Sequence, residues 1–178
     1  ATDASHVNGV VTKVGTGAFT FPVGDNTSYR PITMSSPSSA TDVFTAQYIH
    51  ADPKPTYPQS SRDITLNNVS KYEYWMLNRV NGSSNVTVNL SWNINSGSIT
   101  SMGQLHVAGW STAQSKWKDL GNSATTGNTG AGTATSGGPV TIFGAFTLAS
   151  LTANNVLPID LLYFKCNKIN ASLVDIDW

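Results

Sequence analysis

Apolar and polar residues alternate with a period of two along most of this chain. The alternation is clearest in SNVTVNLSWNI, where five apolar residues are separated by polar ones. These apolar residues are Val86, Val88, Leu90, Trp92 and Ile94. A period of two places every second side chain on the same face of a β-strand. We therefore expect a half-buried strand here, with Trp92 in the core.

The segment before it, KYEYWMLNRV (residues 71–80), also alternates, with Trp75 and Leu77 on one face. Its aromatic residues favour a strand over a helix. Asn81 and Gly82 separate the two alternating runs, and an Asn-Gly pair is a strong signal for a β-hairpin. We expect the two segments to pair across this turn.

Further short segments have the same strand chemistry and are broken by Gly, Pro and Asn. They are residues 9–15, 18–24, 29–35, 42–50, 103–110, 116–121 and 139–150. Residues 51–62 hold three prolines and predict an ordered loop. Residues 121–138 are rich in Gly, Ser and Thr and predict a loop with room for one short edge strand. Many short strands with close turn signals predict an all-β fold, an antiparallel, jelly-roll-like β-sandwich over residues 1–155.

The last residues, VLPIDLLYFKCNKINASLVDIDW (156–178), read as a proline-marked linker followed by a β-hairpin tail. Two interpretations stay open. The segment is the linker and opening strands of a following domain, or it is a strand-donor tail that pairs with this sandwich or with a neighbouring subunit. The residues expected to carry such pairing are Leu161, Tyr163, Leu173, Ile176 and Trp178.

Composition narrows the range of partners. Only 11% of the residues are charged and the formal net charge is zero, so we expect no binding to nucleic acid or to an anionic membrane surface. The sequence contains no run of about 18 apolar residues, so we expect no membrane span. Cys166 is the only cysteine, so packing has to hold the fold. The N-terminus lacks a signal-peptide pattern, and we expect a removed signal or a piece of a longer chain.

Six motifs in a fixed order carry a resemblance to a known kind of module. They are SHVNGVVTKVGTGAFTFPVGDNTSYRPITMS, EYWMLNR, VTVNLSW, LHVAGW with KWKDLG, FGAFTLAS, and LPIDLLYFKCNKINASLVDIDW. Together they resemble a β-sandwich module of secreted and surface proteins of Bacteroidetes, which precedes fibronectin-III-like and type IX secretion sorting domains. Val10 departs from that pattern, which often has Pro there. The resemblance implies export and a modular architecture, and it implies no enzymatic activity.

The ionisable residues form no recognisable catalytic motif. Asp175 and Asp177 share one face of a strand, whereas a glycosidase needs two carboxylates facing each other across a cleft. The only glutamate, Glu73, is expected to form a salt bridge with Arg79 or Arg62 at the rim. Zinc-ligand spacings, a P-loop and a nucleophile elbow are all absent from the sequence. We therefore expect no enzymatic activity.

Calcium is the one cofactor that the loops suggest. The segment VGDNTS (residues 23–28) offers carboxylate and carbonyl oxygens, the ligands that Ca²⁺ prefers. Asp25 is the first candidate ligand, although the same residues also describe a simple turn. No EF-hand pattern occurs, and no other cofactor is expected.

Three aromatic residues are candidates for binding a ligand. Sugar-binding sandwiches present aromatic rings beside polar side chains. Trp110 and Trp117 flank the predicted hairpin loop at residues 111–115. They either form a platform at the rim or pair across the hairpin as a structural clasp. Tyr57, in the proline-rich loop, is the other candidate for an exposed ring.

The sequence thus predicts a secreted β-sandwich module at the cell surface. A structural or adhesive role is favoured, with other modules or copies of the same chain as partners through strand edges. The alternative is a non-catalytic carbohydrate-binding module, with a polysaccharide as its partner.

Overall fold

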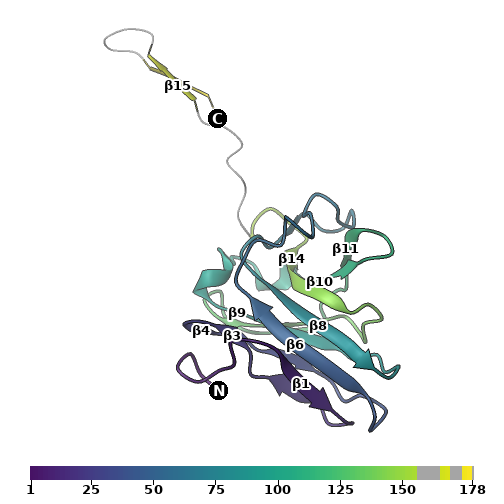
Figure 1. The fold of residues 1–178 in the computed structure, drawn as a ribbon. Coiled ribbons are helices and arrows are strands. Elements are labelled where there is room, and N and C mark those ends of the chain that lie inside the picture. The colour runs from purple at the N-terminus through teal and green to yellow at the C-terminus, as the bar shows by residue number, and fades with distance from the viewer. Residues whose placement is uncertain (156–164, 169–173, 178) are drawn as a thin grey trace.

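Two antiparallel sheets pack face to face (Figure 1). The larger sheet has the order β1-β6-β8-β14-β10-β11, and β7 pairs with β14. Its strands are β1 (Val11–Val14), β6 (Val43–Ile49), β7 (Asn68–Val69), β8 (Tyr74–Asn81), β10 (Leu105–Ser111), β11 (Lys116–Asp119) and β14 (Gly144–Ser150). This computed structural model describes residues 1–155, 165–168 and 174–177. The prediction of an all-β, antiparallel sandwich is confirmed.

The smaller sheet has five strands in the order β12-β13-β9-β5-β2. They are β2 (Phe19–Phe21), β5 (Ile32–Met34), β9 (Val88–Trp92), β12 (Ala124–Gly127) and β13 (Gly132–Thr135). The remaining short elements of the sandwich are β3 (Gly24–Asp25), β4 (Ser28–Tyr29), and the 3₁₀ helices η1 (Ile94–Ser96) and η2 (Met102–Gln104). None of the described helices has the length and apolar character needed to cross a membrane.

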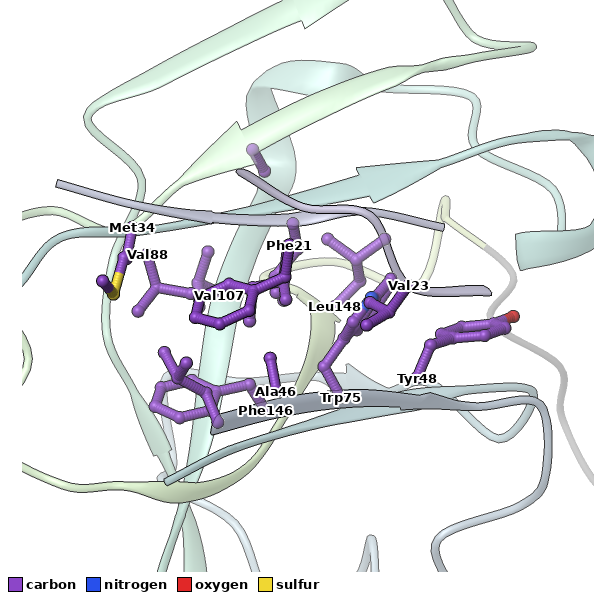
Figure 2. Close-up of a cluster of buried hydrophobic side chains, with 14 of the residues drawn as sticks. Phe21, Val23, Met34, Ala46, Tyr48, Trp75, Val88, Val107, Phe146 and Leu148 are labelled. Atoms are coloured by element: carbon purple, nitrogen blue, oxygen red, sulfur yellow. The ribbon is translucent and has the colours of Figure 1, made fainter. Parts of the chain in front are cut away.

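The main core fills the space between the two sheets, as Figure 2 shows. Phe21, Met34 and Val88 extend from the smaller sheet toward Trp75 and Phe146 of the larger one, and all five side chains are fully buried. Each such side chain contributes about 1.5–3 kcal/mol by leaving water. Strict alternation explains the arrangement, because a strand with one apolar face buries it only against a second sheet.

A second apolar cluster covers part of the outer face of the larger sheet. Its fully or largely buried members are Leu66, Val69, Ala108, Trp117, Ala145 and Ala149. Residues 51–66 pass over β14, β10 and β11 and close this cluster from outside. Tyr74 and Met76 at the start of β8 pack against this cluster. Among the described residues, the rest of the outer face of β1, β6 and β8 has no such cover, and its side chains are half-buried or exposed.

Two local expectations were wrong. β8 and β9 do not pair across Asn81 and Gly82, because β8 belongs to the larger sheet and β9 to the smaller one. Arg79 holds the connection between β8 and β9 by donating hydrogen bonds to the carbonyl oxygens of Ser83 and Ser84. Ile94 does not continue the buried face of β9, since it lies in η1 with 81% of its surface exposed.

The Gly-rich segment 121–138 forms a hairpin of two strands, β12 and β13, rather than a loop with one edge strand. β13 pairs with β9 and extends the smaller sheet. Gly132 stands directly opposite Trp92, and a β-carbon at Gly132 would approach the Trp92 ring within 2.4 Å. The Thr126 carbonyl oxygen would lie still closer, at 2.1 Å, so the backbone of β12 and the Trp92 ring together leave room only for glycine.

β15 (Lys165–Lys168) and β16 (Val174–Asp177) pair with each other as an antiparallel sheet of two strands. Cys166 stands opposite Ile176 in this pair. The other residues predicted to carry tail pairing, Leu161, Tyr163, Leu173 and Trp178, lie outside the described residues.

Candidate functional site

Trp110 and Trp117, the two predicted platform residues, form a clasp across the β10–β11 hairpin. They are direct cross-strand partners, with ring centroids 5.6 Å apart and nearly perpendicular planes. Trp117 is fully buried and Trp110 is half-buried. β10 and β11 pair as far as Ser111 and Lys116, so residues 112–115 make the turn. The structure therefore has the clasp arrangement, and Trp117 offers no face to a ligand.

Tyr57 completes this aromatic cluster and is not free on the surface of its loop. Its ring packs at 5.4 Å from Trp110, 5.9 Å from Trp117 and 5.8 Å from Tyr74. The backbone N–H of Tyr57 donates to the carbonyl oxygen of Pro53, which turns the loop inward. Trp117 Nε1 in turn donates to the Tyr57 carbonyl oxygen at 3.2 Å. The proline-rich loop is thus tied to β11 by rings and backbone together.

A group of charges holds the same loop at its other end. Asp63 accepts ion pairs from Lys116 at 2.7 Å and Lys118 at 3.0 Å, and its Oδ2 accepts from the Asp119 backbone N–H. Partial burial raises the pKa of Asp63, but the hydrogen bonds from the two lysines outweigh it and lower this pKa to about 2. The Asp63 carboxylate therefore anchors residues 61–66 to β11.

His106 and Asp119 form a second polar pair beside it. His106 Nδ1 lies 2.6 Å from Asp119 Oδ1, and Thr65 Oγ1 donates to Asp119 Oδ2 at 2.7 Å. Burial raises the pKa of Asp119, yet the hydrogen bonds from His106 and Thr65 leave it lowered overall. Both partners are mostly buried, at 19% and 15% exposure. The His106–Asp119 pair, with Thr65, therefore connects β10, β11 and the covering residues 51–66.

Glu73 does not form the predicted rim salt bridge with Arg79 or Arg62. It is 1% exposed and pairs with Arg30, whose Nε and Nη2 donate to the two carboxylate oxygens at 3.0 and 2.5 Å. Tyr48 Oη donates to the same carboxylate at 2.7 Å. Burial above all, with the adjacent Glu73 charge, raises the pKa of Tyr48, so its hydroxyl stays protonated as a donor.

Arg30 also joins the two sheets. Its Nη2 donates to the Ser91 carbonyl oxygen and to Ser96 Oγ, and its guanidinium lies 5.5 Å from the centroid of the Trp75 ring. Burying an ion pair is costly unless every polar atom is satisfied. Here the carboxylate and the guanidinium make five hydrogen bonds in total, two of them to each other. The buried Arg30–Glu73 pair therefore connects the two sheets inside the sandwich.

Asp25 lies in the hairpin turn that joins β3 to β4. It pairs with Ser28, and Asn26 between them has the positive φ of 47° typical of such turns. The turn interpretation of this segment is therefore confirmed. Within the described residues, no three His, Cys, Asp or Glu side chains come together as a metal-binding group.

A surface that the sequence analysis did not single out lies on the uncovered outer face of β6 and β8. It is a hollow of about 260 Å³ lined by Val10, Thr45, Ala46, Gln47, Met76 and Asn78. The alternation of β6 contained the signal, because Phe44 and Tyr48 point into the core and so place Thr45 and Gln47 outside.

Comparisons of this chain with protein-family models, with curated proteins and with solved structures found no match. The resemblance to a Bacteroidetes surface module consequently remains a prediction from the sequence motifs.

Proposed function

We propose that this chain is an extracellular structural or adhesive module, which assembles with other copies of itself through strand edges. The observation that carries the proposal is that β15 and β16 pair in a sheet that has two strands among the described residues. An isolated two-stranded hairpin is at best marginally stable in water. Such a pair gains stability when it adds to another sheet, which is a known mode of protein assembly.

The sandwich offers edges for this addition. β1 and β11 are the outer strands of the larger sheet, and β2 and β12 are those of the smaller one. Val10, next to β1, exposes 61% of its surface, and Val14, the last residue of β1, exposes 60%. An exposed edge strand with apolar residues is a template for a further strand. We favour β1 as the acceptor for the β15–β16 pair of a neighbouring copy.

The internal use of the aromatic rings also supports this role over the alternative. Tyr57, Trp110 and Trp117 pack against one another. A carbohydrate-binding module built on these three rings has less support, because a platform ring needs a free face. The extracellular location rests on the low charge content and on the motif resemblance.

Hydrogen exchange of the full chain tests the proposal. Amides of Lys165–Lys168 and Val174–Asp177 are expected to exchange more slowly as protein concentration rises, and β1 amides are expected to slow in parallel. Intermolecular strand addition satisfies these donors, so protection depends on association. Exchange at the rate of an unstructured chain at every concentration would refute the proposal.

A further inference from the structure

The hollow on the outer face of β6 and β8 has a regular chemical layout. Strand pairing places Thr12, Thr45 and Asn78 in one row, because Thr12 is the partner of Thr45 and Thr45 is the partner of Asn78. The next row holds Gln47 and Met76, which are also direct partners. Adjacent rows on one face of a sheet lie about 7 Å apart. Hydroxyl and amide groups therefore stand beside an apolar thioether.

Aromatic rings continue this surface in the next row. Tyr74 pairs with Ile49, and its half-buried ring meets Tyr57 edge to face at 5.8 Å. Tyr57 Oη lies 3.8 Å from Met76 Sδ, which joins the hollow to the aromatic cluster. From Thr45 to Ile49 the face extends about 14 Å. That length suits a short oligosaccharide better than a single ring.

The polar side chains of the hollow differ from those on the opposite sheet, because they have no hydrogen-bond partner among the described residues. Within the described part of the chain, the side chains of Thr45, Gln47 and Asn78 make no hydrogen bond to protein groups. The contrast is with the outer face of the smaller sheet, where Thr20 bonds Thr33 at 2.9 Å. Asn89 there donates to Thr133 and Thr135. One face has thus paired its polar groups internally, and the other keeps them available.

We infer that this hollow binds a neutral oligosaccharide, with Gln47 and Asn78 bonding sugar hydroxyls and Met76 and Tyr74 packing against a ring face. None of the lining residues carries a charge, so a uronic acid or a sulfated sugar finds no counter-charge there. Sugar sites combine apolar and aromatic contact with a few polar groups that fix orientation. The volume of about 260 Å³ lies just below the range of about 300–1,000 Å³ typical of ligand pockets, which suits one ring with its neighbours along the strands. No lining residue of the hollow belongs to β15 or β16, so the inference goes beyond the proposed assembly role.

The test is titration of the full chain with maltohexaose, cellohexaose, laminarihexaose, mannohexaose and xylohexaose, followed by amide chemical shifts. At least one neutral probe is expected to shift amides of β6 and β8. Hexagalacturonate, an anionic probe, is expected to bind at least about tenfold more weakly than that neutral probe, since it finds no cation in the lining.

The variant Gln47→Ala/Asn78→Ala is expected to weaken binding at least about tenfold, the loss of roughly one to two hydrogen bonds. Gln47 is half-buried and Asn78 is exposed, both on the outer face of the sheet, so the variant keeps the core intact. The matched control Thr20→Ala/Thr33→Ala removes two polar groups from the opposite face and is expected to leave binding unchanged. The inference is overturned if no neutral probe binds at millimolar concentration, if hexagalacturonate binds best, or if the Gln47→Ala/Asn78→Ala variant binds as the parent does.

Discussion

Trp110 and Trp117 meet edge to face across the β10–β11 hairpin, with an interplanar angle of 76°. The fully buried Trp117 belongs to the second apolar cluster, and the Tyr57 ring packs against it. These ring contacts join β10, β11 and the covering residues 51–66, so they stabilise all three segments. The clasp therefore helps to hold residues 51–66 on the sheet, together with the Asp63 ion pairs.

Trp117→Ala is expected to lower the free energy of unfolding by about 3–5 kcal/mol, because it empties a buried site of a large ring. Trp110→Ala is expected to cost less, since the Trp110 ring is half-buried. Urea unfolding of the two variants beside the parent measures both values. Equal and negligible losses would show that the rings are not a structural clasp.

Because Arg30 and Glu73 form a buried ion pair, we expect replacing Glu73 alone to lower the free energy of unfolding more than replacing both residues. Glu73→Gln leaves the Arg30 guanidinium buried without its counter-charge, and we expect a loss of about 3–5 kcal/mol. Arg30→Met/Glu73→Gln removes the remaining charge and is expected to recover part of that loss. A double-mutant cycle in urea measures the coupling. Additive losses would contradict a direct buried pair.

Asp42 predicts a substitution that increases stability. It is 1% exposed, and within the described residues neither carboxylate oxygen has a hydrogen-bond partner. A buried carboxylate without partners is costly, so the isosteric Asp42→Asn is expected to raise Tm by about 2–4 °C for each kcal/mol gained. Asp3→Asn removes the same charge from an exposed residue whose Oδ1 accepts from the Tyr29 N–H, and no increase is expected. A lower Tm for Asp42→Asn would show that the carboxylate has a stabilising partner.

The anchoring of the covering segment by Asp63 has a defined pH range. The pKa of Asp63 is lowered from 3.8 to about 2, so its charge stabilises the fold fully above pH 3.8. This contribution is lost as the pH falls through about 2. The Tm difference between the parent and Asp63→Asn is therefore expected to be constant above pH 4 and to shrink toward pH 2. A difference that does not change with pH would contradict the ion pairs with Lys116 and Lys118.

The period-two pattern predicted the strands well because it is local. Trp75 and Leu77 point into the core as expected, and Trp92 does as well. Which strands pair is decided by contacts between distant segments, and so the Asn81–Gly82 signal gave a hairpin that does not form. The 43-residue separation between Arg30 and Glu73 hid their pairing in the same way.

Part of the candidate site was nevertheless present in the sequence pattern. Glu73, one residue before β8 begins, is in phase with Trp75 and Leu77, so alternation alone places it on the inner side of the sheet. Thr45 and Gln47 are out of phase with the buried Phe44 and Tyr48, and alternation places them outside. Alternation does not show which part of the outer face is covered by another segment. It therefore did not predict that residues 51–66 cover β14, β10 and β11 and leave β1 and β6 open.

Sedimentation velocity over a concentration series tests the central claim most directly. The full chain is compared with a chain that lacks residues 159–178, an end chosen to keep the fully buried Asn155 away from the new carboxylate. We predict that the full chain associates as concentration rises, that the shortened chain stays monomeric, and that both give the same melting of the sandwich. A full chain that sediments as a monomer at every concentration, like the shortened chain, would contradict assembly through the β15–β16 pair.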